Sequence, residues 1–202
     1  MTLKPVAPRS DILFHPAQIN RGGEAGRVHA IVQRITQGFE AALAGLVILM
    51  MLAIVVQVVC NALDINPLMT VSEPILLVGR ALTLNSLLDA QWHLLVVLGL
   101  VPAGWVWLQD RHVRVDFLVR RYRPVWQARL DLAGNAVFAA PFLAFILPAA
   151  WTFMERAWRS DEGSRNGGLE DLWLIKSVLP LGLSILAVSV LLETARRLRA
   201  AR

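Results

Sequence analysis

Residues 38–60 read GFEAALAGLVILMMLAIVVQVVC, and this stretch indicates what class of protein the chain belongs to. Its one charged residue, Glu40, lies close to its start. A helix of about 20 residues is long enough to cross the hydrocarbon core of a bilayer. The strands of a membrane barrel would alternate apolar and polar side chains, and this run does not alternate. Because backbone groups in lipid need internal hydrogen bonds, the stretch predicts a transmembrane helix.

Three further apolar runs follow the first one. The composition agrees with them, since 56% of the 202 residues are hydrophobic and 17% are charged, against about 25% charged residues in a soluble domain. The sequence therefore predicts an all-α integral membrane protein with four transmembrane helices. The expected spans are at about residues 38–60, 89–109, 131–154 and 172–193. We expect one membrane domain over residues 25–199, behind a mobile leader over residues 1–24.

The positive charges between the runs predict the direction of the spans. Residues 109–131 read QDRHVRVDFLVRRYRPVWQARLD and hold six arginines. Of the 20 lysines and arginines, fifteen fall on the side that holds this segment and both termini, and five fall on the other. Positive charge stays on the cytoplasmic side during insertion, so we expect both termini in the cytoplasm. The basic residues flank apolar spans rather than form one basic face, so they indicate topology and no nucleic-acid partner.

Two segments outside the spans are expected to lie in the membrane interface. Val28, Ile31, Val32 and Ile35 have the spacing of an amphipathic helix that rests on the headgroups. Residues 74–84, PILLVGRALTL, are apolar but too short to span and are interrupted by Arg80. Ser72 and Pro74 resemble a helix start, so we expect a short flat helix there. A re-entrant half-helix is the alternative for this segment.

The sequence offers little for enzymatic or redox chemistry. Cys60 is the one cysteine, which leaves no disulfide framework and no cysteine-based metal site. His93 and His112 border the second span at opposite ends, about 28 Å apart, too far for a bis-histidine haem within one chain. No Ser-His-Asp spacing, metal-ligand spacing or glycine-rich phosphate loop is visible. We therefore expect that the chain is not an enzyme and holds no cofactor or metal.

The centres of the predicted spans are almost entirely apolar. Gln57, Asn135 and Asp131 lie near span ends, and Lys176 is close enough to an end to extend to the headgroups. A protein that carries its own polar substrate needs polar groups near mid-bilayer or broken helices around a site. The pattern favours a protein that packs against another membrane protein. Small residues permit close helix approach, in the first span at Ala41, Ala42, Ala44 and Gly45 and in the third at Gly134, Ala136, Ala139 and Ala140.

Three motifs in matching order resemble the small membrane subunit of tripartite ATP-independent periplasmic (TRAP) transporters. The first, SLLDAQWHLLVVLG (residues 86–99), resembles the acid-X-Gln-Trp entry to the second span in the branch labelled for mannitol, chloroaromatic or dicarboxylate substrates, with Asp89 where that branch usually has Glu. The second, LQDRHVRVDFL (residues 108–118), resembles the His-(Ile/Val)-X-Val-Asp motif. The third, SDEGSRNGGLEDLWLIKSVLPLG (residues 160–182), resembles a Glu-X-Ser loop followed by Lys and Leu-Pro-Leu-Gly.

The resemblance implies a non-catalytic role in the bacterial inner membrane. The large membrane subunit is expected to hold the substrate and sodium sites and to move like an elevator, while a periplasmic binding protein delivers an organic acid or related solute. The small subunit is expected to act as part of a static scaffold. Candidate contacts with the partner or within the scaffold are Asp89, Gln91, Trp92, His112, Arg114, Asp116, Glu162, Ser164 and Lys176. Candidate anchors for phospholipid headgroups are Arg111, Arg120, Arg121 and Arg123.

Two other functions fit the same pattern of spans. One is the membrane anchor of a redox enzyme, with a quinone or haem held between subunits. The other is a general scaffold with four spans. A visible haem absorption band or a bound quinone would favour the first of these, whereas loss of sodium-driven uptake on deletion would favour the transporter subunit.

Overall fold

The computed structural model describes residues 24–109, 112 and 121–200. Within these ranges the chain is mainly helical, and four helices are long and apolar enough to cross a membrane. This confirms the predicted all-α membrane class and its four spans. The four stretches are His29–Ala62, Leu84–Leu108, Val125–Arg159 and Trp173–Arg199.

The chain divides into two compact units, Met1–Gly45 and Leu46–Arg202. The described part of the first unit is helical and belongs to α1 (Glu24–Ala62). The predicted amphipathic segment around residues 28–35 is helical, but it is part of α1 rather than a separate helix. The predicted leader lies almost wholly outside the described residues, and the single domain over residues 25–199 stays a prediction.

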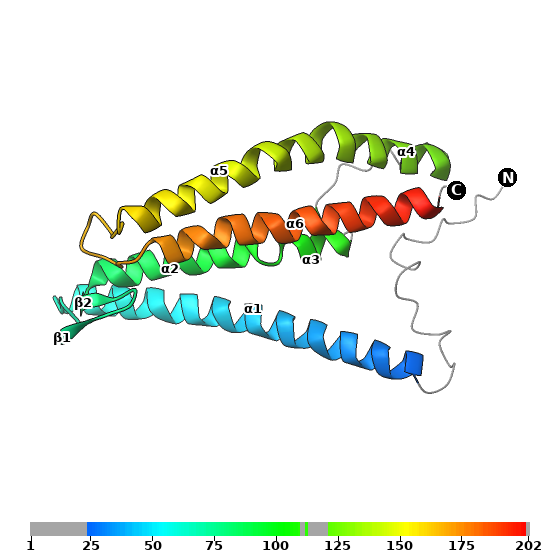
Figure 1. Ribbon diagram of the computed structural model, residues 1–202. Helices are drawn as coiled ribbons and strands as arrows, with labels where there is room; N and C mark the ends of the chain where they lie inside the picture. Colours follow the sequence, from blue (N-terminus) through cyan, green and yellow to red (C-terminus); the bar gives the residue numbers. More distant parts are fainter. Residues whose placement is uncertain (1–23, 110–111, 113–120, 201–202) are drawn as a thin grey trace. The chain divides into compact units, whose positions relative to one another are not determined.

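Helix α6 (Trp173–Ala200) is the central element of the second unit. It packs against α5 (Ala140–Arg159) on one side and against α2 (Leu84–Leu100) and α3 (Ala103–Leu108) on the other (Figure 1). The buried apolar side chains of the described residues come mainly from α5 and α6 and include Leu143, Ala150, Ala157, Leu183 and Val190. The core of this small bundle therefore lies along α6.

Two glycines allow α6 to approach α2 and α3 closely. A Cβ on Gly104 would lie 2.7 Å from Cγ2 of Ile185 and 2.9 Å from its carbonyl oxygen, so no larger residue fits there without a shift. A Cβ on Gly182 would lie 2.8 Å from Cβ of Leu100. The second span also breaks between α2 and α3, next to Pro102, which cannot donate a backbone hydrogen bond. These two glycines lie outside the small-residue stripes of the first and third spans, and they allow the close contact between α6 and the second span.

The third span contains a wide helical turn. Helix α4 (Pro124–Gly134) continues into a π-helix (Asn135–Ala139) and then into α5. A π-helix inserts an extra residue into one turn and shifts the side chains that follow. Its first residue, Asn135, donates to the hydroxyl oxygen of Thr194 on α6 at 2.9 Å. The irregular turn is thereby tied to α6.

The segment between the first two spans is a β-hairpin, so the short helix predicted over residues 74–84 is wrong. Strands β1 (Met69–Ile75) and β2 (Gly79–Leu82) pair antiparallel, with Met69 opposite Leu82 and Ile75 opposite Gly79. Gly79 has a φ of +67°, a backbone conformation that glycine adopts at low cost. The actual helix start is Thr83, whose side chain accepts from the backbone N–H of Ser86 and caps α2.

Candidate functional site

Several predicted residues meet at the end of the second unit that carries the hairpin, which we call the hairpin end (residues 63–89 and 160–176). Asp89, on the first turns of α2, accepts a hydrogen bond from the backbone N–H of Leu169 at 3.0 Å. A Cβ on the neighbouring Gly168 would collide with the Asp89 carboxylate, so the loop approaches α2 as closely as its backbone allows. Thr83 adds a second link, since its hydroxyl donates to the carbonyl oxygen of Gly167 at 2.8 Å. Asp89 therefore fixes the loop onto α2.

The same loop holds the turn of the hairpin. The backbone N–H of Leu77 donates to the carboxylate of Asp171 at 3.2 Å, and its carbonyl accepts from the backbone N–H of Glu170 at 2.8 Å. Leu77 has a φ of +72°, which a non-glycine residue adopts only at some cost. The Glu170 side chain also occupies the space that a Cβ on Gly79 would need. Contacts with a loop more than 90 residues away thus hold the hairpin in place.

The hairpin end also contains three further predicted residues, Glu162, Ser164 and Lys176. Lys176 and Glu162 form an ion pair with Nζ and Oε2 2.5 Å apart, and the ammonium lies 4.2 Å from the centre of the Phe153 ring. The Lys176 side chain is only 15% exposed, so it turns inward to Glu162 instead of extending to the headgroups as we expected. The backbone N–H of Ser164 donates to the carbonyl oxygen of Leu169 at 2.8 Å. These contacts close the loop on itself and onto α6.

Gln91 and Trp92 lie on α2 but take part in different contacts. Gln91 donates to the side-chain oxygen of Gln57 on α1 at 2.5 Å. Trp92 is 61% exposed and is free to meet lipid or another chain. His93, on the next position, bonds through Nδ1 to the carbonyl of Asp89 at 2.5 Å, so Nδ1 is the protonated nitrogen. The predicted Gln-Trp motif therefore divides between a contact inside the chain and an outward-facing aromatic ring.

The second predicted motif falls mostly outside the described residues. Arg111, Arg114, Asp116 and Arg120 lie there, so the structure does not place them. His112 is described: its Nε2 lies 3.2 Å from the carbonyl oxygen of Ala103, and its ring meets the Trp107 ring edge to face at 5.5 Å. Arg121 and Arg123 are exposed. The His112 ring thus packs against α3.

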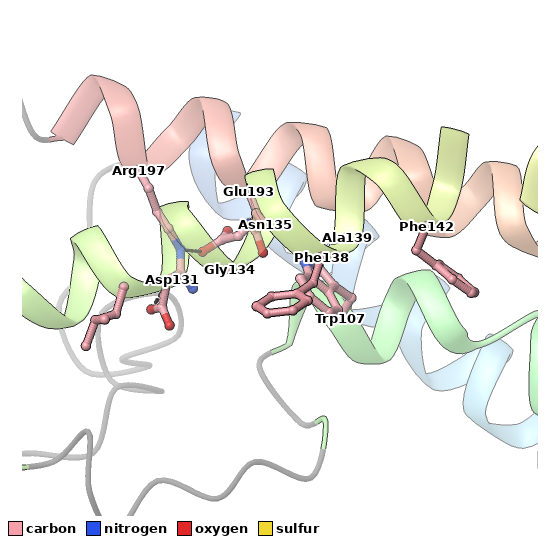
Figure 2. A pocket seen from close by; sticks show the side chains of 10 residues that line it. Trp107, Asp131, Gly134, Asn135, Phe138, Ala139, Phe142, Glu193 and Arg197 are labelled. Atoms are coloured by element: carbon pink, nitrogen blue, oxygen red, sulfur yellow. Dashed lines mark hydrogen bonds and ion pairs between the residues drawn. The ribbon is translucent and has the colours of Figure 1, made fainter. Parts of the chain in front are cut away.

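Sequence reasoning missed a charged cluster at the opposite end, which we call the arginine-rich end (residues 105–109, 121–131 and 193–200). Arg197 on α6 pairs with Asp131 on α4, and its Nε donates to Glu193 at 2.7 Å (Figure 2). All three side chains are at most 20% exposed. Glu193 and Arg197 have the i, i+4 spacing of a helical ion pair, which was the signal available in the sequence. The partner of Arg197 on α4, Asp131, is 66 residues away in the sequence, so this pair is evident only from the folded structure.

The described residues do not gather ligands for a metal ion: among them, no three His, Cys, Asp or Glu side chains lie close enough to hold one. His93 and His112 bond to backbone carbonyls on different turns of the second span. The polar clusters at the two ends consist of ion pairs and backbone caps. Such an arrangement positions helices and loops, and it supplies no nucleophile with an adjacent base.

Comparisons with known proteins indicate the family to which the chain belongs. No curated protein matches the sequence. The family model of the DctQ component of tripartite ATP-independent periplasmic transporters matches residues 77–200, which include the β2 strand, the loop cluster and three of the four spans. This match covers more than half of the chain, and members of the family are transporter components rather than enzymes. The chain therefore belongs to the DctQ family, the small membrane component of TRAP transporters.

Proposed function

We propose that the chain is a static scaffold that holds the large membrane subunit of a TRAP transporter during uptake. The family works with a large DctM subunit and a periplasmic binding protein. In this proposal the large subunit carries the substrate and the sodium ions, and the binding protein delivers an organic acid or related solute. In this proposal this chain itself binds neither the sodium ions nor the solute.

The distribution of polar groups supports the proposal. The described ionisable side chains of α5 and α6 lie near the helix ends. Lys176 pairs with Glu162 of the preceding loop, and Arg197 pairs with Asp131 of α4 and with Glu193. The centres of these helices carry no ionisable side chain, and the hydroxyls of Ser184 and Ser189 in α6 donate to backbone carbonyls of their own helix. None of the most apolar 18-residue stretch of α1 is buried within the chain. A protein without a polar path but with a large apolar helix face is suited to packing against a partner in the membrane.

The fixed geometry of the hairpin end also supports a static role. Asp89, Asp171 and Lys176 tie the loop of residues 160–172 to three other elements. A scaffold must keep its shape while the partner moves, and a loop held by side chains from several elements resists local opening. Under the proposed orientation, with both termini in the cytoplasm, this end faces the periplasm. It is then on the side where the binding protein delivers its solute.

Uptake by reconstituted vesicles tests the proposal. Proteoliposomes would contain the large subunit alone, this chain alone, or both, with the binding protein and its labelled solute outside and an inward sodium gradient. We expect uptake only with both subunits, and loss of that uptake when the sodium gradient is collapsed. Uptake by this chain alone would overturn the scaffold role. Full uptake by the large subunit alone would do the same.

A further inference from the structure

The third span meets α6 through two different kinds of side chain. In α5 the buried residues are Leu143, Ala150 and Ala157, which are spaced seven apart. Residues seven apart on an α-helix lie on nearly the same side, because about 3.6 residues make one turn. α6 is the helix against which α5 packs. These three residues therefore mark the side of α5 that faces α6, and we call them the buried stripe.

A regular α-helix would extend the buried stripe toward the arginine-rich end through Ala136 and Leu132. These residues precede Leu143 by seven and eleven positions, which are about two and three full turns. Both side chains are apolar and suited to packing against α6. Ala136 is nevertheless exposed in the structure. The buried stripe therefore does not continue as a regular helix would carry it.

The contacts with α6 are instead made one position earlier in the sequence. Asn135 donates to the hydroxyl oxygen of Thr194 at 2.9 Å, and Asp131 pairs with Arg197 (Figure 2). Each of these two residues of the third span stands immediately before one of the apolar residues that a regular helix would place there. A step of one residue is about 100° around a helix axis. The part of the span next to the arginine-rich end is thus turned by about this angle relative to α5.

The π-helix accounts for this rotation. It lies between the polar contacts and the buried stripe, and the backbone N–H of Ala140 donates to the carbonyl of Asn135, five residues earlier. Such a wide turn takes up one residue more than an α-helical turn, so the side chains before and after it are offset by one position. This surplus residue brings Asp131, instead of Leu132, to α6.

We propose that the third span has two registers against α6 and that its polar contacts hold it in the π form. In the other form, which we call the all-α form, the span is a regular helix, and Leu132 and Ala136 face α6. A change from one form to the other turns α4 by about 100° and changes which of its side chains point away from α6. This inference goes beyond the scaffold role, since it names the device that fixes the orientation of α4.

Two opposing effects decide between the forms. The all-α form regains the regular backbone bonds of an α-helix and buries two apolar side chains. The π form keeps the ion pair of Asp131 with Arg197, and both side chains are at most 20% exposed. Separating the charges of a mostly buried pair is strongly unfavourable. Arg197 also pairs with Glu193 on its own helix, so the loss of Asp131 leaves it with a partner and should release the π form.

Deletion of single residues tests the device in the complex of this chain with its large subunit. Deleting Val137, an exposed residue of the π-helix, removes the surplus residue and leaves a regular helix with Asp131 still facing α6. We expect the melting temperature of this complex to stay within about 3 °C of the parent value.

The matched control is the deletion of Val188, a similarly exposed valine on α6. α6 is an α-helix over this stretch, so the deletion turns Thr194 and Arg197 away from the third span. We expect it to lower the melting temperature by about 5 °C or more, or to prevent assembly of the complex. The proposal is overturned if the two deletions destabilise the complex equally.

Cysteine cross-linking reads the register directly. In a chain with Cys60→Ser, Thr194→Cys would be combined with either Asn135→Cys or Ala136→Cys, so that the ion pair of Asp131 alone holds the π form. We expect positions 135 and 194 to form a disulfide about tenfold faster than positions 136 and 194. Asp131→Leu should reverse this preference. An unchanged preference in the Asp131→Leu chain would overturn the proposal, and so would equal rates for the two pairs in the chain that keeps Asp131.

Glu155→Leu is the control for the loss of a carboxylate from the third span. Glu155 lies on α5, beyond the π-helix, and pairs with Arg159 on the same helix. This variant should keep the preference for positions 135 and 194. If it reversed the preference as Asp131→Leu does, the register would not depend on the contact with α6, and the proposal would be overturned.

Discussion

At the scale of single residues, Asp89 is the side chain of the hairpin end whose removal should lower the stability of the complex most. It accepts from the backbone N–H of Leu169, which is 3% exposed and 80 residues away. Asp89→Ala would leave that N–H without an acceptor, which costs about 1–3 kcal/mol. Asp89→Asn keeps an acceptor oxygen and should cost less than half as much. We expect the melting temperature of the purified complex to fall by several degrees in the alanine variant.

The matched control for Asp89 is Glu155→Ala. Glu155 pairs with Arg159 at 2.5 Å, but both side chains are well exposed. An exposed i, i+4 pair contributes at most about 0.5 kcal/mol. The Glu155→Ala complex should therefore have the same melting temperature as the parent complex. An Asp89→Ala complex that melts at the same temperature as this control would show that the link to Leu169 contributes nothing to stability.

The ion pair between Lys176 and Glu162 should be strongly coupled. Lys176 is mostly buried and also lies over the Phe153 ring, so its ammonium has little access to water. Lys176→Met leaves the Glu162 carboxylate without its partner, and Glu162→Gln leaves the ammonium without its counter-charge. In a double-mutant cycle on the free energy of unfolding, we expect a coupling energy of about 1–3 kcal/mol. The same cycle on Arg159 and Glu155 should give less than about 0.5 kcal/mol, and equal couplings in the two cycles would contradict the argument.

At the scale of elements, the contact between α3 and α6 depends on one glycine. Gly104→Ala would place a methyl group against the backbone and side chain of Ile185 and the hydroxyl of Ser189. Backbone atoms cannot move aside as a flexible side chain can, so we expect a loss of about 1–3 kcal/mol. Gly99→Ala is the control, because a Cβ on Gly99 meets nothing within 4 Å.

Gly99→Ala is expected to keep or raise the stability of the complex. Alanine favours a helix over glycine by about 1 kcal/mol, and α2 has room for the methyl group. Thermal melts of the two variants in the same detergent would compare them directly. The prediction fails if the Gly104→Ala complex is as stable as the Gly99→Ala complex. The contact between α3 and α6 would then be able to adjust to an added methyl group.

The elements differ in how far the sequence could predict them. The four long helices follow from apolar runs alone, because length and hydropathy are local properties. The β-hairpin could not be found in this way. Its segment is short and apolar, and helix and strand are hard to separate in such runs. Bonds from Leu77 to Glu170 and Asp171 hold its turn, and those partners come from a distant loop.

The candidate site shows the same division between local and distant information. The resemblance brought out Asp89, Glu162 and Lys176, and the structure places all three at the hairpin end. The Arg197 cluster went unnoticed because its two helices are far apart in the sequence. The proposed roles of all these residues toward other subunits stay predictions, since those contacts involve chains outside this one.

At the scale of the whole molecule, the unequal distribution of arginine predicts which end faces the cytoplasm. The loop of residues 160–172 and the segment before α4 lie at opposite ends of the third span, so they face opposite sides of the membrane. In a chain with Cys60→Ser, Ser160→Cys and Arg123→Cys each provide one exposed thiol. Because positive charge stays inside, we expect a membrane-impermeant maleimide to label Ser160→Cys in cells whose outer membrane is permeabilised. Arg123→Cys should be labelled only after the inner membrane is lysed, and the reverse pattern would place the hairpin end in the cytoplasm, where a periplasmic binding protein cannot reach it.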